Sequence, residues 1–560
     1  MPRLPADRRL HNILPMKNLF TTFLLITIMS QAYPQDGHEK FIYKHNIREL
    51  HRLYAEKHIE NARKASREMD SVIFNGPYKA NYESLSLHPT PEWFMDAKFG
   101  IAINYSLYSI VGAGEQGYGG NYYTDIYLNS MYGSMRPYHI ENWGEDFERD
   151  DFIPLFKAKH LDTEGYVALF KEIGARYFAV FLNHRSTGML LWDSDYTFRD
   201  SKDMLPHRDL AGEFRAACEK NDLPFCAYFN LEDTDYPIVD RETDEIYIRE
   251  WTPIDPGQTA DNGSYEVFHR YDPVKEERRL QGKVPVYDYV DDYLLPISKE
   301  LIDKYEPEYI WYDGGWKRPA WYYKSHKMTA YFYNKYEGEK EVMVNSRMGT
   351  DLYGELGDVV ISEGGNVDGA EYSDYWEEIS PMGRNFAYDR GESDQNVPPS
   401  SDLIRMLIRI VASGGNFLLV VAPDGEGRIP DYQRKRLDEM GKWLAVNGEA
   451  IYETRPHPWY REEDKFGYIT YYTRSKDEKF SYAIVSKLRG NRLILYNATA
   501  KEGTEIRLLG YDKKIEWFNS RWGLNIHLTE DLLKNLPCSH FWVFRFEEDE
   551  QVEYQLQQSE

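Results

Sequence analysis

The chain has 560 residues, which is too long for one compact core, so two domains with short extensions are expected. Its 67 basic and 92 acidic residues give a net charge of −25, which disfavours binding to nucleic-acid backbones or to anionic membrane surfaces. The three cysteines, Cys218, Cys226 and Cys538, lack the spacing of zinc ligands. We interpret them as small buried apolar residues and expect no metal site, no disulfide framework and no cofactor.

The N-terminal residues have the pattern of an export signal. Lys17 precedes an apolar run over 19–29, and small and polar residues follow it. The run is too short to span a bilayer as a stable anchor. Met16 is the expected start, so residues 1–35 are assigned to an extension and a signal peptide. We expect an exported protein, periplasmic or extracellular, with a retained N-terminal anchor as the alternative.

The next residues predict a helical leader and then a barrel. A charged segment with helical periodicity lies within residues 36–87 and is expected to pack outside the main domain. Eight strand-like runs then alternate with polar or helical stretches, which is typical of a parallel α/β architecture. We predict a (β/α)₈ TIM-like barrel over residues 88–455. The runs are Lys98–Asn104, Tyr177–Asn183, Pro224–Leu231, Tyr309–Asp313, Val342–Arg347, Asp358–Glu363, Asn385–Tyr388 and Asn416–Ala422.

Three further segments complete the predicted organisation. Residues 232–288, rich in Asp, Pro and Gly, are expected to form a loop over the site. Apolar residues recur at helical spacing from Gln433 to Asn447, so a helix is predicted to close the barrel. Short alternating runs then predict an antiparallel β-sandwich over residues 456–548, followed by an acidic tail over 549–560.

One predicted strand ends at a carboxylate that could act in catalysis. The run Tyr309–Asp313 is aromatic and stops at Asp313 and a glycine pair. Functional groups of a TIM barrel lie at the C-terminal ends of its strands, and an acid beside Trp311 suits work on a sugar ring. A turn cap is the alternative, because Asp before Gly is common in turns. The residues alone support the catalytic role and the turn cap equally.

Several motifs occur in a specific order along the predicted barrel. Gly414-Gly415-Asn416-Phe417 is followed by Pro423-Asp424-Gly425 and Gly441-Lys442-Trp443-Leu444, and Trp311-Tyr312-Asp313-Gly314 lies upstream. In this order they resemble glycoside hydrolase family 29, the retaining α-L-fucosidases, over about residues 88 to 548. The resemblance implies a TIM-like barrel followed by a β-sandwich, and a carbohydrate substrate. It also implies that Asp313 is the catalytic nucleophile.

A retaining glycosidase needs a second carboxyl group about 5 to 5.5 Å from the nucleophile. Glu363, at the end of the predicted strand Asp358–Glu363, corresponds to a strand of the family that ends in Glu. Glu377, in Tyr375-Trp376-Glu377, corresponds to another recurrent acid of the family. The resemblance implies Glu363 as the first candidate for the acid/base and Glu377 as the reserve. Pairing with a nearby arginine is the alternative role for either glutamate.

The predicted sugar pocket departs from the family pattern. Asn104-Tyr105-Ser106 stands where the family usually has His-Trp-Gly, and Asn183-His184-Arg185 where it has Lys-His-His. Asn104 can still donate and accept hydrogen bonds, and Arg185 could bind a carboxylate or pair with an acid. The resemblance implies substrate-binding roles for Asn104, Asp125, His184, Arg185, Tyr228, Trp311 and Arg347.

These observations lead to three functional hypotheses. The favoured one is an exported, exo-acting retaining glycosidase that removes terminal α-L-fucosyl residues from glycans or polysaccharides by double displacement. The second keeps this mechanism and changes the sugar to a fucose-like residue such as α-L-galactose, because the altered pocket could read other hydroxyls. The third is a catalytically weak glycan-binding relative, which the retained carboxyl pair disfavours. The sequence predicts no particular oligomeric state.

Overall fold

The structure is a computed structural model that describes residues 46–112, 128, 135–184, 187–233, 235–253, 264–315, 318–351, 355–363 and 375–549. The predicted signal peptide, Asp125, Arg185 and residues 550–560 of the predicted tail lie outside these ranges. Among the described helices, none is both long enough and apolar enough to cross a membrane.

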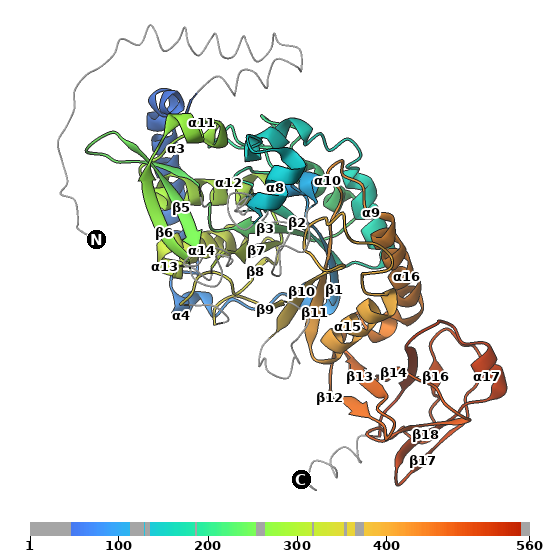
Figure 1. Ribbon diagram of the computed structural model, residues 1–560. Helices are drawn as coiled ribbons and strands as arrows, with labels where there is room; N and C mark the ends of the chain where they lie inside the picture. Colours follow the sequence, from blue (N-terminus) through green and yellow to red (C-terminus); the bar gives the residue numbers. More distant parts are fainter. Residues whose placement is uncertain are drawn as a thin grey trace.

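Eight parallel strands form one sheet in the order β8-β7-β3-β2-β1-β11-β10-β9 (Figure 1). A parallel bridge between Asn345, just after β8, and Val359, just before β9, joins the two ends of this order and closes the barrel. The predicted TIM-like barrel is therefore confirmed. Its strands are β1 (Phe99–Ile103), β2 (Tyr177–Asn183), β3 (Phe225–Asn230), β7 (Tyr309–Asp313), β8 (Met343–Val344), β9 (Val360–Glu363), β10 (Trp376–Pro381) and β11 (Gly415–Val421).

The predicted position of the seventh strand is wrong. The strand is β10, whereas the run Asn385–Tyr388 forms bends and no strand. β10 is hard to recognise because it carries two adjacent glutamates, and yet both are buried. Glu378 is compensated by the hydroxyl of Ser380, which donates a hydrogen bond of 2.6 Å to its Oε1. Buried acids with hydrogen-bond donors can occupy a strand that reads as polar.

The insertion over residues 232–288 is a folded element and not the loop expected from its composition. It contains an antiparallel sheet of β4 (Pro237–Val239), β5 (Ile246–Pro253) and β6 (Ser264–Arg270), followed by the helix α11 (Pro273–Leu280). Its apolar residues pack together with the first residue of α3 in one cluster, comprising Ile47, Val239, Ile246, Ile248, Tyr271 and Leu280. Ile246 and Ile248 are buried and alternate with the half-buried Glu245 and Tyr247, as expected for a strand with one buried face.

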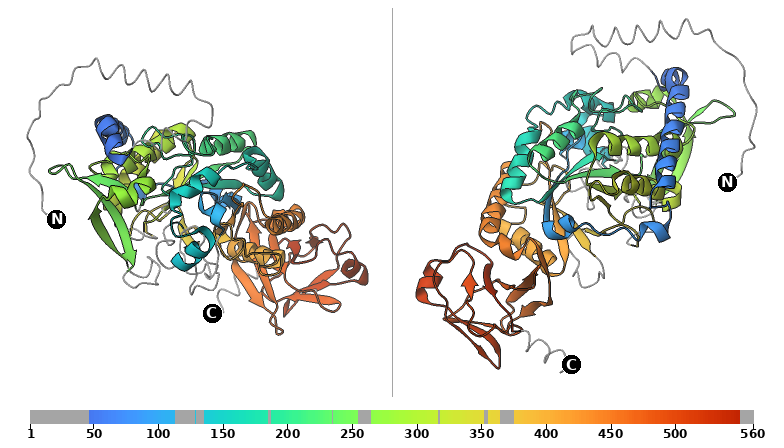
Figure 2. Two further views of the ribbon diagram at one scale, coloured as in Figure 1. Left: turned by 45° about the horizontal axis from the view of Figure 1, so that its top comes forward. Right: turned by 180° about the vertical axis from the view of Figure 1, so that it is seen from behind.

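Helices surround the barrel on its outer side (Figure 2). The predicted leader helix is α3 (Ile47–Asn75), which buries one apolar face against α12 (Leu295–Tyr305) and α14 (Ser325–Tyr336). The other long helices are α9 (Thr163–Ile173), α10 (Leu210–Lys220), α15 (Ser400–Ala412) and α16 (Asp431–Asn447). Shorter ones are α4 (Tyr82–Leu85), α5 (Glu92–Ala97), α6 (Tyr108–Val111), α8 (Arg136–Trp143), η3 (Arg149–Leu155), η5 (Val290–Leu294), α13 (Ala320–Tyr323) and η7 (Gly448–Ala450).

The C-terminal domain is the predicted β-sandwich. One sheet has the order β12-β13-β14-β19-β16 and the other β15-β18-β17, with an apolar core between them. The indole N–H of Trp443 in α16 lies 3.0 Å from the carbonyl oxygens of both His540 and Phe541, which ties this domain to the barrel. The elements are β12 (Thr454–Glu463), β13 (Ile469–Ser475), β14 (Ser481–Val485), β15 (Arg492–Leu495), β16 (Arg507–Leu508), β17 (Trp517–Ser520), β18 (Gly523–His527), α17 (Glu530–Lys534) and β19 (Trp542–Phe546).

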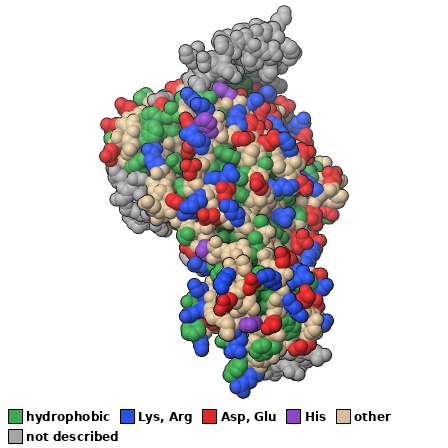
Figure 3. Space-filling model, turned by 90° about the vertical axis from the view of Figure 1, so that its right-hand side faces the viewer, with side chains coloured by type: hydrophobic (Ala, Val, Ile, Leu, Met, Phe, Trp, Pro, Cys, Tyr) green, Lys and Arg blue, Asp and Glu red, His purple; other side chains and the backbone are tan. Residues whose placement is uncertain are grey.

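Charges and cysteines complete the description of the two domains. On the face shown in Figure 3, acidic and basic side chains are interspersed over both domains, so this face carries no broad patch of one sign. All three cysteines are free. Cys218 and Cys226 are buried as predicted, whereas Cys538 is only half-buried.

Glu377 in β10 carries a fully buried carboxyl group that lies in the barrel interior. Tyr177 donates its hydroxyl to one carboxylate oxygen at 2.7 Å. The other oxygen accepts the indole N–H of Trp311 at 2.8 Å and the hydroxyl of Tyr309 at 3.3 Å. Burial raises the pKa of Glu377 to about 7, although the three hydrogen bonds favour the ionised form.

The raised pKa predicts how Glu377 affects stability as the pH changes. The folded protein holds this proton up to about pH 7, whereas the unfolded chain releases it near 4.5. The stabilisation of the folded protein by this bound proton is therefore complete below pH 4.5 and is lost as the pH rises to about 7. The side chain of Glu377→Gln stays neutral at every pH. We therefore expect the unfolding free energy of the wild type, relative to that of Glu377→Gln, to fall by on the order of 3 kcal/mol between pH 4.5 and 7.

Urea denaturation of both proteins at closely spaced pH values between 4 and 8.5 measures this difference. Subtracting the variant's curve of unfolding free energy against pH from the wild-type curve removes the contributions of groups that titrate alike in both proteins. A difference that stays constant between pH 5 and 8 would contradict the raised pKa.

Candidate active site

The C-terminal ends of β7 and β9, which lie on either side of the short strand β8 in the closed barrel, bring together the two carboxyl groups that the sequence singled out. Asp313 is the last residue of β7 and is 8% exposed. Glu363 is the last residue of β9, and its side chain is 36% exposed. Because both strands are parallel members of one barrel, both residues lie at the same rim.

Arg347 connects these two carboxylates. Its Nη1 lies 3.2 Å from Oδ1 of Asp313, and its Nη2 lies 2.7 Å from Oε2 of Glu363. The guanidinium group is planar and rigid, so the two contacted oxygens lie no more than about 8 Å apart. Arg347 is itself buried, and the chain positions it three residues after the short strand β8.

The second oxygen of Asp313 has its own partner. Tyr228, in β3, donates its hydroxyl to Oδ2 of Asp313. One cationic donor and one neutral donor therefore hold the two oxygens of the Asp313 carboxylate and stabilise its negative charge. A carboxylate held in this way has one fixed orientation at the rim of the barrel.

Trp311 packs between the two residues that hold Asp313. β7 lies between β3 and β8 in the sheet. The ring of Tyr228 stacks on the indole with a centroid distance of 5.4 Å and an interplanar angle of 16°. The guanidinium carbon of Arg347 lies 4.9 Å from the centroid of the same indole. Trp311 is thus a buried support for both groups, with cation–π attraction on the Arg347 side.

Glu377 lies deeper in the barrel than Glu363. Strand pairing places Glu363 opposite Ile379 and Ile361 opposite Glu377, so the two glutamates are one inward-facing position apart along the barrel axis. Glu377 has no exposed surface, whereas Glu363 is partly exposed. Of the two candidates for the second carboxyl group, only Glu363 contacts the arginine that holds Asp313.

Two predicted sugar-binding residues lie near one tyrosine. Asn104 follows β1, is fully buried, and accepts the hydroxyl proton of Tyr108 at its Oδ1. His184 follows β2, and its ring meets Tyr108 edge-on at 5.7 Å and stacks on Tyr228 at 6.3 Å. The predicted residues Asn104, His184 and Tyr228 therefore border one region beside Asp313. The predicted residues Asp125 and Arg185 lie outside the described ranges.

Tyr108 and Tyr309 are site residues that the sequence reasoning missed. Tyr309 had a usable signal, because strand alternation places Tyr309, Trp311 and Asp313 on one face of β7. No comparable signal marks Tyr108, which begins the short helix α6 and reaches Asn104 through a turn that the sequence pattern does not reveal.

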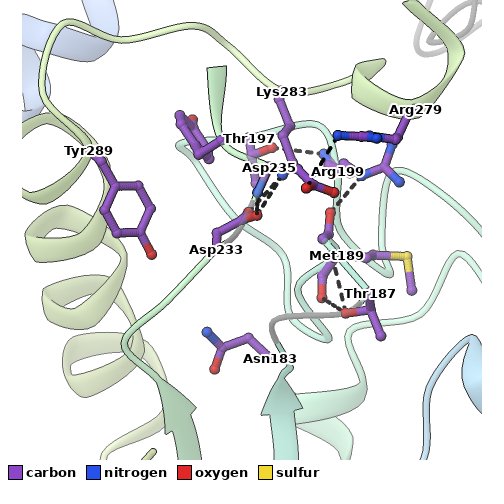
Figure 4. A network of polar contacts seen from close by, with 12 residues as sticks. Asn183, Thr187, Met189, Thr197, Arg199, Asp233, Asp235, Arg279, Lys283 and Tyr289 are labelled. Atoms are coloured by element: carbon purple, nitrogen blue, oxygen red, sulfur yellow. Dashed lines mark hydrogen bonds and ion pairs between the residues drawn. The ribbon is translucent and has the colours of Figure 1, made fainter. Parts of the chain in front are cut away.

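A buried network of charged residues supports the loop that carries His184 (Figure 4). Arg199 donates its Nε–H to the carbonyl of Gly188 at 2.6 Å and pairs with Asp150. Thr187 donates its hydroxyl to the carbonyl of His184 at 2.9 Å. The backbone on both sides of this loop is thus fixed by buried polar groups.

The same network fastens both ends of the insertion that follows β3. Lys283 donates to both carboxylate oxygens of Asp233 at 2.8 Å (Figure 4). The carboxylate of Asp235 pairs with the buried Arg149. Burial lowers the pKa of Lys283 to about 8. These contacts tie the start of the insertion to its end and to η3, which begins at Arg149.

The chemistry of the rim is that of paired carboxyl groups. In the part of the chain that the structure describes, no cluster of three or more His, Cys, Asp or Glu side chains could hold a metal ion. A carboxylate with fixed orientation and a second, partly exposed carboxyl group nearby can supply a nucleophile and a proton donor.

Comparison with known proteins identifies the family. Residues 66–449 match the family model of α-L-fucosidase, and residues 463–547 match that of the α-L-fucosidase C-terminal domain. An α-L-fucosidase of Branchiostoma floridae is 27% identical over 85% of this chain and 97% of its own length. The human plasma α-L-fucosidase is 27% identical over 83% of this chain and 91% of its own length.

Solved structures agree in fold with these relatives. The α-L-fucosidase of Thermotoga maritima in complex with fucose is 27% identical, with a TM-score of 0.66, and the match covers 84% of this chain and all of that one. An α-L-fucosidase of Bacteroides thetaiotaomicron at 18% identity and a TM-score of 0.58 shares the fold. With more than half of the chain matched by the first family model, this protein belongs to the α-L-fucosidase family, glycoside hydrolase family 29, and is a glycoside hydrolase acting on O-glycosyl bonds.

Proposed function

We propose that this α-L-fucosidase is an exported, exo-acting and retaining enzyme that removes terminal α-L-fucosyl residues from glycans or polysaccharides by double displacement. The observation that carries the mechanism is the bridge formed by Arg347 between Asp313 and Glu363. It keeps two carboxyl groups from different strands close enough to act on the two sides of one glycosidic bond.

In the first step Asp313 attacks the anomeric carbon, and a glycosyl ester forms as the bond to the leaving oxygen breaks. Tyr228 and Arg347 hold the two oxygens of Asp313, so the attacking carboxylate is oriented before the sugar binds. Glu363 gives its proton to the leaving oxygen.

In the second step Glu363 acts as a base. It takes a proton from water, the water oxygen attacks the anomeric carbon, and the ester to Asp313 breaks to regenerate the carboxylate. Two successive inversions retain the anomeric configuration. The cation Arg347 stabilises negative charge on both carboxylates whenever they are ionised.

Asp313→Ala removes the nucleophile, and we expect kcat/KM on an aryl α-L-fucoside to fall by about 10³-fold or more. Glu363→Ala removes the proton donor, and we expect a loss of about 10²–10⁴-fold on a poor leaving group with a much smaller loss on a good one. Steady-state kinetics on nitrophenyl and alkyl fucosides measure both effects.

The matched control for these two variants is Glu172→Ala on the exposed side of α9, for which wild-type kinetics are expected. Activity of Asp313→Ala within tenfold of wild type would contradict its role as nucleophile. A leaving-group-dependent loss in Glu377→Ala, with none in Glu363→Ala, would move the acid/base role to Glu377.

A second candidate keeps the mechanism and changes the sugar to α-L-galactose. The observation that favours it is Asn104, which is fully buried beside Tyr108 where the family usually has histidine. L-Galactose differs from L-fucose by one hydroxyl group at C6, so a single altered hydrogen-bonding partner can change the preference.

A panel of nitrophenyl α-L-glycosides compares the two sugars directly. We expect kcat/KM to be higher on the α-L-fucoside than on the α-L-galactoside by at least about tenfold, since one buried polar mismatch costs this much or more. Asn104→His, which inserts the residue usual in the family, tests whether this position sets the ratio. Cleavage of the galactoside alone would contradict the fucosidase assignment.

Export is supported by the apolar run over 19–29 after Lys17. When the full chain is expressed in a Gram-negative host, we expect cleavage after the small and polar residues 30–35, detected as the N-terminal peptide by mass spectrometry of the periplasmic fraction. Deleting residues 16–29 should leave the protein in the cytoplasm. Uncleaved protein in the membrane fraction would instead indicate a retained anchor.

A further inference from the structure

Glu377 is not one of the two carboxyl groups assigned to the reaction, and yet it is connected to them through Trp311. We propose that Glu377 is a positioning residue, which fixes the indole of Trp311 and thereby the two groups, Arg347 and Tyr228, that hold the Asp313 carboxylate. The inference rests on the proposed role of Asp313 as nucleophile.

The first link is the hydrogen bond between Glu377 and the indole. Glu377 projects from β10 across the barrel interior to Trp311 in β7, and its Oε2 accepts the indole N–H at 2.8 Å. The carboxylate cannot swing away, because Tyr177 and Tyr309 bind it as well. An acceptor fixed at one point selects one orientation of the indole ring among its allowed rotamers.

The second link is the contact of the indole with both partners of Asp313. Arg347 lies over its ring at 4.9 Å, and Tyr228 stacks on it at 5.4 Å. A rotated indole would leave a gap beside each of these side chains. Because Arg347 and Tyr228 each bind one oxygen of Asp313, both contacts of the nucleophile would loosen together.

The position of Glu377 does not allow it to act on the substrate itself. Its side chain is fully buried, and both of its carboxylate oxygens accept hydrogen bonds from interior side chains. In the pairing of β9 with β10, Glu363 lies at the rim one inward-facing position above Glu377, and a sugar that contacts Asp313 lies at this rim. A buried carboxyl group is costly, so a role through its hydrogen bonds accounts for its presence better than a role in filling space.

Two substitutions distinguish the role of the hydrogen bond that Glu377 accepts from Trp311 from the role of its ionisable proton. Gln at position 377 can still accept the indole N–H through its amide oxygen and donate to Tyr177, so we expect kcat and KM of Glu377→Gln within about threefold of wild type. Leu has nearly the same volume and no acceptor. For Glu377→Leu we expect kcat to fall about 10- to 100-fold with KM little changed, because small displacements of a nucleophile are costly.

The readout is the ratio of rates on fucosides with good and poor leaving groups. A positioning role predicts that Glu377→Leu loses the same factor on both, unlike Glu363→Ala. The matched control is Tyr336→Phe in α14, which removes another buried tyrosine hydroxyl, one that donates to the carbonyl oxygen of Ile302 at 2.9 Å. It should keep activity within about twofold, because this hydrogen bond lies outside the barrel interior.

Three outcomes would overturn the proposal. These are wild-type kcat in Glu377→Leu, equal losses in the Gln and Leu variants, or a loss that grows with the pKa of the leaving group. If Glu377→Leu fails to fold by circular dichroism, Trp311→Phe replaces it, and wild-type kcat in that variant would refute the proposal. If Asp313 were not the nucleophile, Asp313→Ala would retain activity. This result is distinct from the three outcomes that overturn the positioning role of Glu377.

Discussion

The contact of Arg347 with two carboxylates is the interaction on which the proposed chemistry depends. Asp313 and Glu363 come from β7, next to one end of the sheet order, and β9, at the other end, and the bridge between Asn345 and Val359 brings these ends together as it closes the barrel. Arg347 lies between these strands in the chain and spans the gap with its two terminal nitrogens. Once the barrel is closed, this single guanidinium group therefore sets the distance between the two carboxylates.

The interior below this bridge contains a buried polar cluster around Glu377. Glu377 is surrounded by Tyr177, Tyr309 and Trp311, and the raised pKa of Glu377 shows that burial dominates over these hydrogen bonds. Such a group reduces stability near neutral pH relative to an apolar side chain. In return the hydrogen bonds define the orientation of aromatic rings that apolar packing alone would leave free to rotate.

The outer parts of the molecule position the rim in two ways. The insertion after β3 is a small sheet packed at the start of α3. Lys283 and Asp233 tie its two ends together, and Asp235 ties it to Arg149 of η3. The C-terminal sandwich is attached on a different side through α16 and Trp443. Loops near the site can thus vary while the strands that carry Asp313 and Glu363 remain in place.

The sequence by itself determined the order of elements and the identity of the acid at the end of β7. Alternating strand and helix patterns predicted seven of the eight strands, and the aromatic run before Asp313 marked a buried strand, because these signals are local. Only the tertiary structure decided how the groups around Asp313 contact it and one another. Arg347, Tyr228 and Glu363 lie tens of residues away in sequence, and their contacts depend on barrel closure and strand register. It also decided that β10 is a strand, since Glu377 and Glu378 read as solvent-exposed until the interior donors that compensate them are in place.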